Sequence, residues 1–430
     1  MDVLGINIVA ERIERQKKLK DLIKKCHAGK DGVILLSAGY EKEREQFYQE
    51  SSFEYFVGLQ ESAVVLWQEL NGSAFLYSPH YGVDRAAWLP ISYDEERLAT
   101  LEIESVELFG EKIAGYATGP FYTKESLSNV CAHLERVCKQ GNFIFMPMDD
   151  VSIEVKIFIE QLLKYVPKLV DHIIDIAPLI AQLRQKKSQQ ELEYMYHAIE
   201  ITGMAHQAAS GVIKKGNSES DVQAAIEYIY TESNAKKAFA SVVGSGINST
   251  ILHYIDNKDR LPDDGLVVVD IGASFNHYCA DITRTYPVSG SFSQRQKKVY
   301  QDVLDTQEYV AECAKPGVYL NNKNEPDNSL NHLAHEFLKK RGYNVEKEFP
   351  HGIGHFVGLD VHDVGDYSVP LAVGDVITIE PGIYLREENL GVRIEDMYWV
   401  VKDGVICLSE EIPKKIKDVE RFMKESHFTE

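Results

Sequence analysis

Three histidines, His351, His355 and His362, lie within the short stretch HGIGHFVGLDVHD at residues 351–363. Imidazoles this close together could bind a metal ion or move protons. Glycines follow His351 and precede His355, which disfavours a regular helix between them, and the zinc-protease pattern HExxH is absent. A single buried histidine is most often structural. The stretch therefore predicts a metal site only if further ligands come from elsewhere in the chain.

Two aspartates occupy matching places in the segment LVVVDIGASFNHYCADITRTYPV, residues 266–288. A turn centred on Phe275 and Asn276 would pair the two halves so that Asp270 faces Asp281, with Cβ atoms about 5 Å apart. Like charges at this spacing repel and are costly to bury, and a bound cation would remove the conflict. A solvent-facing hairpin with two exposed aspartates is the alternative, although the surrounding apolar residues favour burial.

A second pair of carboxylates lies in the segments DVITIEPGIY (375–384) and GVRIEDMYWVV (391–401), which we expect to be strands. Glu380 and Glu395 could each direct a carboxylate inward. Arg393 shares a strand face with Glu395, so its guanidinium would partly neutralise the two glutamates. A strand carrying surface ion pairs is the alternative interpretation.

Four carboxylates and one imidazole form an oxygen-rich ligand set, which suits hard divalent metals such as Mn²⁺ better than metals that prefer thiolates. Five such ligands in one pocket could hold two metal ions about 3.5–4 Å apart, and a hydroxide bridging them would be a nucleophile at neutral pH. The chemistry implied is metal-assisted hydrolysis of an acyl bond.

The elements that must position these residues form two regions with different patterns of secondary structure along the 430-residue chain. Strands alternate with helices in the first part, which includes the buried strand GVILLSAG (32–39) and a hairpin turn at Asn71-Gly72. The second part opens with a helix for which Ser188 and Glu191 form a capping box, and continues mainly as strands and turns. We therefore expect an α/β chain of two domains, residues 1–175 and 176–430.

The composition limits the partners and the compartment. The formal net charge of −20 argues against nucleic acid or an anionic membrane as a main partner. No apolar run reaches the roughly 18 residues of a membrane span, and the N-terminal residues lack the pattern of a signal peptide. Six scattered cysteines suit free thiols in a reducing compartment. We expect a cytoplasmic protein.

Five motifs, in their order and spacing, resemble the pita-bread metallopeptidases, the family of methionine aminopeptidase, prolidase and Xaa-Pro aminopeptidase. They are VVVDIGA, ADITRTYPV, HGIGHFVGLDVHD, ITIEPGIY and VRIEDM. The resemblance covers roughly residues 180–410. More weakly, YQESSFEYFVGLQESAVVL (48–66) is similar to the additional N-terminal domain of Xaa-Pro aminopeptidases and prolidases, which methionine aminopeptidases lack. The resemblance as a whole implies a creatinase-like mixed α/β domain followed by an α+β pita-bread catalytic domain with a curved antiparallel sheet.

The resemblance also implies a metal centre with two divalent ions per chain, for which Mn²⁺ is the leading candidate and Co²⁺ and Zn²⁺ are alternatives. Asp270 would chelate one ion through both oxygens, and Asp281 and Glu395 would bridge the two ions. His355 and Glu380 would bind the second ion.

Further residues acquire catalytic roles from the same resemblance. Glu380 would accept the proton of the attacking water. His362 would donate to the scissile carbonyl as its oxygen gains charge, an effect worth several kcal/mol in such sites. His351 would line the pocket for proline, and His253 would contact the substrate. Arg393 would hold the ligand carboxylates and the histidines in place.

The activity implied is that of an Xaa-Pro aminopeptidase acting on proline-containing peptides, with Xaa-Pro dipeptidase (prolidase) as the close alternative. A non-catalytic pita-bread binding protein is a distant alternative, because such proteins have lost the metal ligands. A creatinase-like C–N hydrolase would work without this ligand set. We expect a homo-oligomer, dimer or tetramer, with the N-terminal domain serving oligomerisation or substrate access. Trp88 is expected to pack in the core, the alternative being contact with a neighbouring subunit's site.

Overall fold

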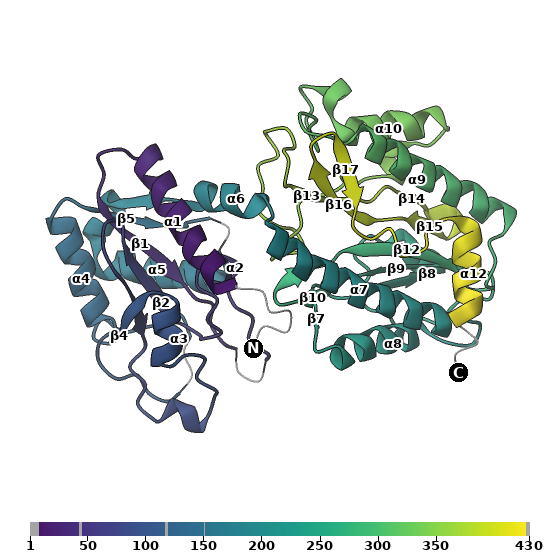
Figure 1. Cartoon of the computed structure of the whole chain (residues 1–430). Coiled ribbons are helices and arrows are strands. Elements are labelled where there is room, and N and C mark those ends of the chain that lie inside the picture. Colours follow the sequence, from purple (N-terminus) through teal and green to yellow (C-terminus); the bar gives the residue numbers. More distant parts are fainter. Residues whose placement is uncertain (1–7, 43–44, 117–118, 150, 427–430) are drawn as a thin grey trace. The chain divides into compact units, whose positions relative to one another are not determined.

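The protein is described by a computed structural model over residues 8–42, 45–116, 119–149 and 151–426. The chain forms two compact units, Met1–Arg184 and Gln185–Glu430, which are described separately (Figure 1). The predicted two-domain α/β organisation is confirmed. The division falls after Arg184, nine residues beyond the boundary expected at residue 175.

The N-terminal unit contains a six-stranded mixed sheet in the order β4-β3-β2-β1-β5-β6. The predicted hairpin pairs β2 with β3 in antiparallel register, and β1 pairs antiparallel with β2 and parallel with β5. Parallel pairing also joins β3 to β4 and β5 to β6. The strands are β1 (Gly32–Ser37), β2 (Val65–Glu69), β3 (Ala74–Ser78), β4 (Ile103–Leu108), β5 (Phe143–Met146) and β6 (Ile173–Asp175).

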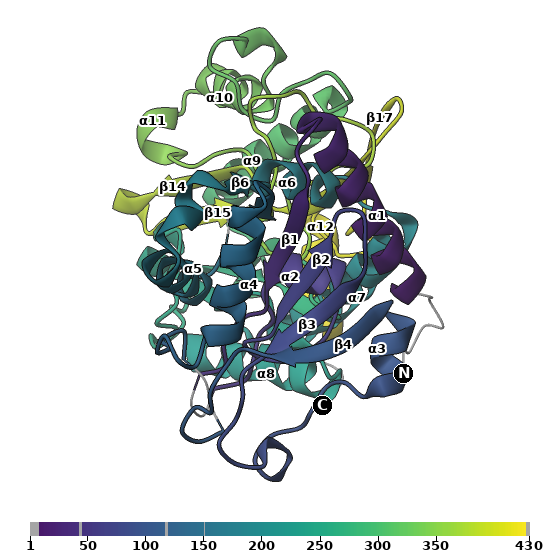
Figure 2. The ribbon, with the colours of Figure 1, turned by 90° about the vertical axis from the view of Figure 1, so that its left-hand side faces the viewer.

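Helices cover both faces of this sheet, with α1 on one side and α4 and α5 on the other (Figure 2). Apolar side chains of α4 and α5 pack with those of β1 and β2 in one buried cluster that includes Leu35, Trp67, Leu134 and Phe158. The helices are α1 (Ile8–Cys26), α2 (Ser51–Phe56), α3 (Glu95–Thr100), α4 (Ser128–Lys139), α5 (Ile153–Tyr165) and α6 (Ala177–Gln185), with short 3₁₀ helices at Arg85–Ala87 and Pro167–Asp171.

Trp88 lies outside this core. Its side chain is 60% exposed and stacks on Tyr116, with ring centroids 4.4 Å apart. The expectation of core packing is therefore wrong. The residue that the loop buries is Arg85, whose guanidinium contacts the carboxylates of Glu41 and Glu61. The ion pairs of Arg85 thus anchor the loop and leave the indole at the surface.

The C-terminal unit has helices on two sides of its strands. Helices α7 and α8 lie together on one side, and α9 and α10 lie on the other (Figures 1 and 2). The capping box predicted for Ser188 and Glu191 is present at the start of α7. The helices are α7 (Gln189–Val212), α8 (Glu219–Glu232), α9 (Gln294–Cys313), α10 (Leu330–Lys340), α11 (Val345–Glu348) and α12 (Ile416–Ser426), with 3₁₀ helices at Gly246–Thr250, Pro326–Asn328 and Arg386–Glu388.

The strands between these helices form short antiparallel ladders, in the orders β12-β9-β8, β11-β10-β7, β13-β16-β17 and β14-β15. They are β7 (Lys236–Lys237), β8 (Val242–Ser245), β9 (Leu266–Ile271), β10 (Ala273–Phe275), β11 (Tyr278–Cys279), β12 (Ile282–Pro287), β13 (Val376–Ile379), β14 (Gly382–Leu385), β15 (Leu390–Arg393), β16 (Asp396–Val401) and β17 (Gly404–Cys407).

The pairing of β9 with β12 differs from the predicted register. Asp270 faces Thr283, and not Asp281. The reason lies in the turn, which is centred one residue later than expected, at Asn276 and His277, both with positive φ angles of 47° and 71°. Two consecutive residues with positive φ are typical of the two-residue type I′ turn that joins twisted antiparallel strands. The prediction placed the turn at residues 275–276, so the partner that it gave for Asp270 was wrong by two residues.

The two glutamates lie at a gap between ladders. Strand β13 pairs with β16, and β14 pairs with β15, in one continuous register that places Glu380 opposite Glu395 where the ladders are interrupted. Backbone groups at this gap bond to other segments, because the Glu380 N–H donates to the Ile353 carbonyl and the Glu395 N–H donates to that of Thr283. The interruption therefore connects both glutamates to the segments that carry the other ligands.

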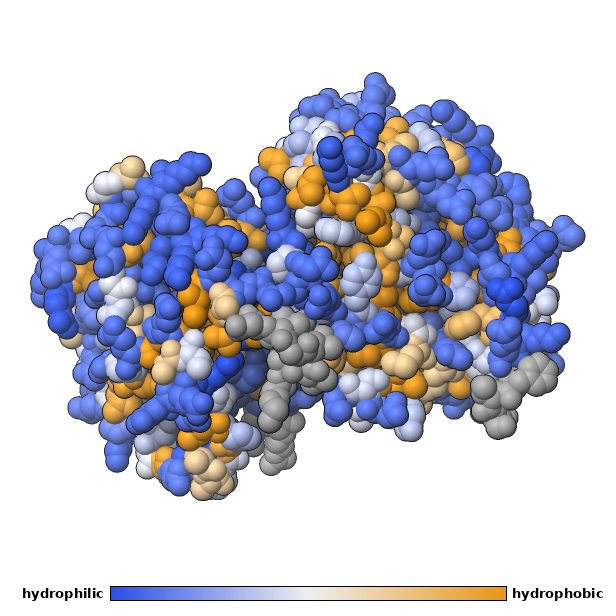
Figure 3. Space-filling model, in the orientation of Figure 1, coloured by the Kyte–Doolittle hydropathy of each residue, from blue (hydrophilic) through white to orange (hydrophobic). Residues whose placement is uncertain are grey.

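The surface shown in Figure 3 is mainly hydrophilic on both units, in keeping with the charged composition. Within the described residues, no helix combines the length and apolar character that a membrane crossing requires.

Candidate active site

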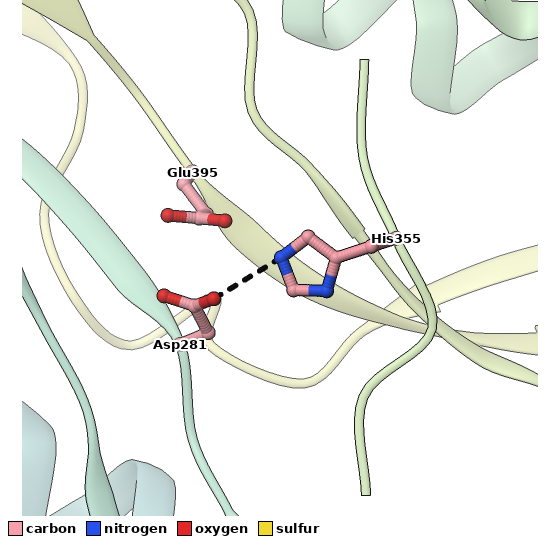
Figure 4. Close-up of side chains that lie close together, drawn as sticks. All are labelled: Asp281, His355 and Glu395. Atoms are coloured by element: carbon pink, nitrogen blue, oxygen red, sulfur yellow. Dashed lines mark ion pairs between the residues drawn. The ribbon is translucent and has the colours of Figure 1, made fainter. Parts of the chain in front are cut away.

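Three predicted ligands converge in the C-terminal unit. Asp281 immediately precedes β12, Glu395 lies between β15 and β16, and His355 lies in the loop before β13. One ligand atom of each lies within 4.8 Å of the others, and all three side chains point toward one another (Figure 4). The His355 Nε2 atom is 3.2 Å from the Asp281 Oδ2 atom. This spacing places three donor atoms around a volume suited to a metal ion.

The other two predicted ligands, Asp270 and Glu380, line the same cavity, whose volume is about 480 Å³. The Glu380 Oε1 atom is 3.8 Å from the Nε2 atom of His355. The Asp270 Oδ2 atom accepts a hydrogen bond from Arg393, whereas its Oδ1 atom is buried and has no hydrogen-bond partner. A buried carboxylate oxygen without a partner is costly, and a cation would compensate it.

Burial shapes the electrostatics of this cluster. Desolvation, followed by the charge of neighbouring carboxylates, raises the pKa of Asp281 and of Glu395 well above their usual values. Desolvation also raises the pKa of Glu380 to about 7, against the opposing effect of His355. Without a cation, the site therefore favours protonated carboxyl groups, and a divalent cation would favour their ionised, ligating form.

The imidazole of His355 is oriented for ligation. Its Nδ1 atom is 3.0 Å from the Phe356 carbonyl oxygen, which can only accept a hydrogen bond. Nδ1 therefore carries the proton, and the lone pair of Nε2 is directed toward Asp281 and Glu380. With four carboxylates and this imidazole, the residues present fit hard divalent cations.

Arg393 connects the ligands to each other. Its three groups of N–H donors bond to separate acceptors: Nη2 to Asp270 Oδ2 at 2.6 Å, Nε to Thr283 Oγ1 at 3.2 Å and Nη1 to the Tyr384 hydroxyl at 2.8 Å. Thr283 in turn donates to Glu395 Oε2 at 2.7 Å. The predicted supporting role of Arg393 is consistent with these bonds. Thr283 and Tyr384 were not anticipated, although both lie within recognised motifs, ADITRTYPV and ITIEPGIY.

His351 continues this hydrogen-bond chain. Its Nδ1 atom donates to the Gly352 carbonyl at 2.8 Å, so the Tyr384 hydroxyl, also 2.8 Å away, donates to its Nε2 atom. Desolvation, with a smaller effect of Arg393, lowers the pKa of His351 to about 3. The ring is therefore neutral at physiological pH, as expected for a residue that lines a pocket rather than carrying charge.

His362 and His253 lie on the cavity wall with the ligands. The rings of His362 and His355 are perpendicular, with centroids 4.3 Å apart. Burial, then the neighbouring His355, lowers the pKa of His362, so its ring is neutral near pH 7. The rest of the wall is largely apolar and includes Phe239, Ala240, Val242, Leu252, Ile255 and Val361. The cavity thus combines a polar metal cluster with an apolar surface that could accept side chains of a substrate.

A cluster of carboxylates and a histidine that could hold metal ions, beside an apolar cavity wall, suits metal-assisted hydrolysis, and comparison with known proteins agrees. The sequence profile of metallopeptidase family M24 matches residues 193–402. Intermediate cleaving peptidase 55 of Saccharomyces cerevisiae is 32% identical over 74% of this chain and 69% of its own length.

Other relatives carry the names of both expected activities. The Xaa-Pro aminopeptidase of Haemophilus influenzae is 34% identical over 58% of this chain and 64% of its own length. The Xaa-Pro dipeptidase of Pyrococcus horikoshii is 37% identical over 57% of this chain and 68% of its own length. The structure of Escherichia coli aminopeptidase P has the same fold, with a TM-score of 0.79, 24% identity and coverage of 97% of this chain and 99% of its own.

The chain belongs to metallopeptidase family M24. The family resemblance stated from its motifs is thereby confirmed.

Proposed function

We propose that this protein is an Xaa-Pro aminopeptidase, which hydrolyses the peptide bond before proline and releases the N-terminal residue. The observation that carries the proposal is the cavity in which five metal-ligand candidates face an apolar wall. All five side chains are retained, which argues against a non-catalytic binding protein. It also argues against a hydrolase that works without metal.

Each group around the cavity has a role in this reaction. Asp270, Asp281, His355, Glu380 and Glu395 would hold two divalent ions. When bound, these ions supply Lewis acidity toward the scissile carbonyl and lower the pKa of water. The carboxylate of Glu380, which lines the cavity with its Oε1 atom 3.8 Å from the Nε2 atom of His355, would accept a proton.

The neutral histidines would act on the substrate. His362 would donate a hydrogen bond to the carbonyl oxygen that gains charge. His351, held by Tyr384 and the Gly352 carbonyl, would border the proline ring, and His253 would contact the peptide. Arg393 would keep Asp270 and the Tyr384–His351 pair in place, and through Thr283 it would support Glu395.

The scarcity of basic side chains in the cavity lining favours aminopeptidase over dipeptidase action. A free Xaa-Pro dipeptide carries a carboxylate on the proline, which would have to enter the cavity with the substrate. Among the described residues that line the cavity, Arg393 is the one lysine or arginine, and its three donor groups already bond to Asp270, Thr283 and Tyr384. The dipeptide carboxylate would therefore lose hydration without gaining a free cationic partner. In a longer peptide, a neutral amide occupies this position.

The decisive test compares three substrates that share one Xaa-Pro bond: the dipeptide Gly-Pro, its amide Gly-Pro-NH₂ and the tripeptide Gly-Pro-Gly, each with Mn²⁺, Co²⁺ or Zn²⁺ added to metal-free enzyme. We expect kcat/KM to be higher for the amide and the tripeptide than for the dipeptide. The amide is the matched control, because it removes the carboxylate charge while keeping the dipeptide length. Preferential cleavage of Gly-Pro would instead assign the chain as an Xaa-Pro dipeptidase, the named activity of the Pyrococcus horikoshii relative.

The identity of the bound metal and the oligomeric state are also part of the proposed function. Mn²⁺ is the favoured metal, because the donor set is dominated by carboxylate oxygens. The two units would divide the work, with the N-terminal unit serving oligomerisation or substrate access in a cytoplasmic dimer or tetramer. Metal analysis of protein purified without added metal and light scattering would test these two points.

A further inference from the structure

The segment from Ser245, the last residue of β8, to Asp259 forms part of the wall of the active-site cavity. It contributes Leu252, His253 and Ile255 to the lining. Apart from Ser245, which ends β8, and a 3₁₀ helix at Gly246–Thr250, the segment has no regular secondary structure. A loop of this kind lacks the repeated backbone bonds of a strand or helix, so its conformation must be fixed by other contacts.

Those contacts converge on one side chain. Glu219, the first residue of α8, is completely buried. Its Oε1 atom accepts hydrogen bonds from the Ser245 N–H at 2.8 Å, from the Ser245 hydroxyl at 2.7 Å and from Asn248 Nδ2 at 3.1 Å. Its Oε2 atom accepts from the Tyr254 hydroxyl and from the Asp259 N–H, each at 2.9 Å. One carboxylate thereby holds the two ends and the middle of the segment.

We propose that Glu219 is a positioning residue for substrate binding, which holds residues 245–259 so that His253 and its apolar neighbours face the cavity. Tyr254, which bonds directly to Glu219, is adjacent to His253 in the chain, so the carboxylate fixes the backbone that carries the imidazole. The inference rests on the proposed peptidase function for its kinetic readout. The arrangement of the loop can also be measured without any substrate.

Replacing one carboxylate oxygen of Glu219 by an NH₂ group tests whether the segment needs two hydrogen-bond acceptors at this position. Both carboxylate oxygens face a backbone N–H, one from Ser245 and one from Asp259. Glutamine has one carbonyl oxygen and one NH₂ group, so in either orientation its NH₂ group would point at a backbone donor. Glu219→Gln should therefore release one end of the segment while keeping the size of the side chain.

The matched control is Asp221→Asn. Asp221 lies in the same first turn of α8, but its carboxylate accepts hydrogen bonds from the N–H and the hydroxyl of Ser218, as part of the capping box of the helix. We expect Glu219→Gln to lower kcat/KM for an Xaa-Pro tripeptide by roughly tenfold or more, since hydrogen bonds to a charged group contribute on this scale. Metal stoichiometry should stay as in the wild type, and Asp221→Asn should stay within about twofold of wild-type kcat/KM.

A double-variant comparison separates positioning from a general effect on stability. If Glu219 acts through His253, the loss caused by Glu219→Gln should be much smaller in a His253→Ala background than in the wild type. Equal losses in both backgrounds, or wild-type kcat/KM for Glu219→Gln, would overturn the proposal. If Glu219→Gln does not fold, Tyr254→Phe removes a single donor to the same carboxylate, and the same comparison applies with a smaller expected loss.

Hydrogen–deuterium exchange of the whole chain gives the readout that needs no substrate. In Glu219→Gln, exchange should accelerate in residues 245–259, while the ladder of β13 with β16 should exchange as in the wild type. Unchanged exchange in residues 245–259 would contradict the proposal even if activity falls. Faster exchange in an enzyme that cleaves no Xaa-Pro peptide would uphold the loop anchor and refute the proposed function instead.

Discussion

In the N-terminal unit, the buried guanidinium of Arg85 contacts two carboxylates, Glu41 and Glu61, which gives this cluster a formal charge of +1 − 2 = −1. In the C-terminal unit, the guanidinium of Arg393 lies among the four carboxylates of the candidate metal site, and their ionised forms give +1 − 4 = −3. One divalent ion would bring this second cluster to −1, and two would bring it to +1. The Arg85 cluster therefore carries one excess negative charge without any ion, whereas the cluster around Arg393 reaches that value only with a divalent cation.

The buried charges around Arg85 hold a loop in place, whereas those around Arg393 have the properties of a site for chemistry. The acids around Arg85 are paired with a cation of the protein and need nothing further. The carboxylates around Arg393 have raised pKa values for Asp281, Glu380 and Glu395, because burial and mutual repulsion oppose their ionisation. Strongly perturbed acids in a cavity are a physical signature of a functional site.

The largest expected effect comes from making the same substitution in one glutamate of each cluster, Glu380 and Glu61. Glu380→Gln should lower kcat by about 10²–10⁴-fold, because it removes a proton acceptor and a metal ligand. Glu61→Gln makes the same chemical change beside Arg85 and should leave kcat for an Xaa-Pro tripeptide close to wild type. Steady-state kinetics with metal analysis would check both variants. An unchanged rate for Glu380→Gln would remove Glu380 from the mechanism.

The second prediction concerns a buried pair that is already balanced. The Lys187 ammonium is 2.8 Å from the carboxylate of Asp363, next to His362, and both side chains are 1% exposed. Lys187→Met should lower the free energy of unfolding by about 3–5 kcal/mol, because it leaves a buried carboxylate without its cation. Lys215→Met, at an exposed pair with Asp263, should change it by less than about 1 kcal/mol. Denaturant unfolding of the two variants tests the difference, and equal effects would show that burial of the first pair is not decisive.

The third prediction is that metal stabilises one unit selectively. With free metal at about 100 times its dissociation constant, the C-terminal unit should gain about 2.7 kcal/mol of stability over the chelated protein. Both carboxylates of the cluster around Arg85 contact its guanidinium without metal, so the N-terminal unit should be unaffected. Hydrogen exchange resolved by unit, with and without chelator, measures both at once. Equal protection of both units by metal would contradict the contrast drawn between the two clusters.

The last prediction concerns the pH dependence of stability at a histidine that is buried away from solvent. His206 is completely buried, and its ring nitrogens contact the Ile282 carbonyl and the Tyr286 hydroxyl. Burial lowers its pKa to about 3, below the value of about 6.5 in an unfolded chain. The unfolded state therefore binds the proton more readily, and the stability contributed by neutral His206 is lost as pH falls from about 6.5 toward 3.

Each pH unit in this window should cost about 1.4 kcal/mol of unfolding free energy. Unfolding curves measured from pH 7 to pH 4 should become less steep in pH for His206→Gln, which has no group that titrates there. An identical pH dependence in the variant would show that other groups control acid unfolding.

The four carboxylates and their approximate elements could be read from the sequence, because each of them lies in or beside a recognisable apolar strand. Asp270 follows VVV in β9, and Glu380 directly follows ITI of β13. The register of the first hairpin could not be read, because it depends on whether the turn uses residues 275–276 or 276–277. Positive φ angles at Asn276 and His277 decided it.

The sequence by itself indicated the two-domain α/β class and an acidic, oxygen-rich set of candidate ligands, and its motifs showed the resemblance to a metallopeptidase family. Only the tertiary structure decided which polar groups support those ligands. The bonds from Arg393 to Asp270 and from Glu219 to residues 245–259 join positions far apart in the chain. Residue order fixes local periodicity, whereas such partners are selected by the packing that buries them, since a buried charge must find its partners wherever the fold brings them.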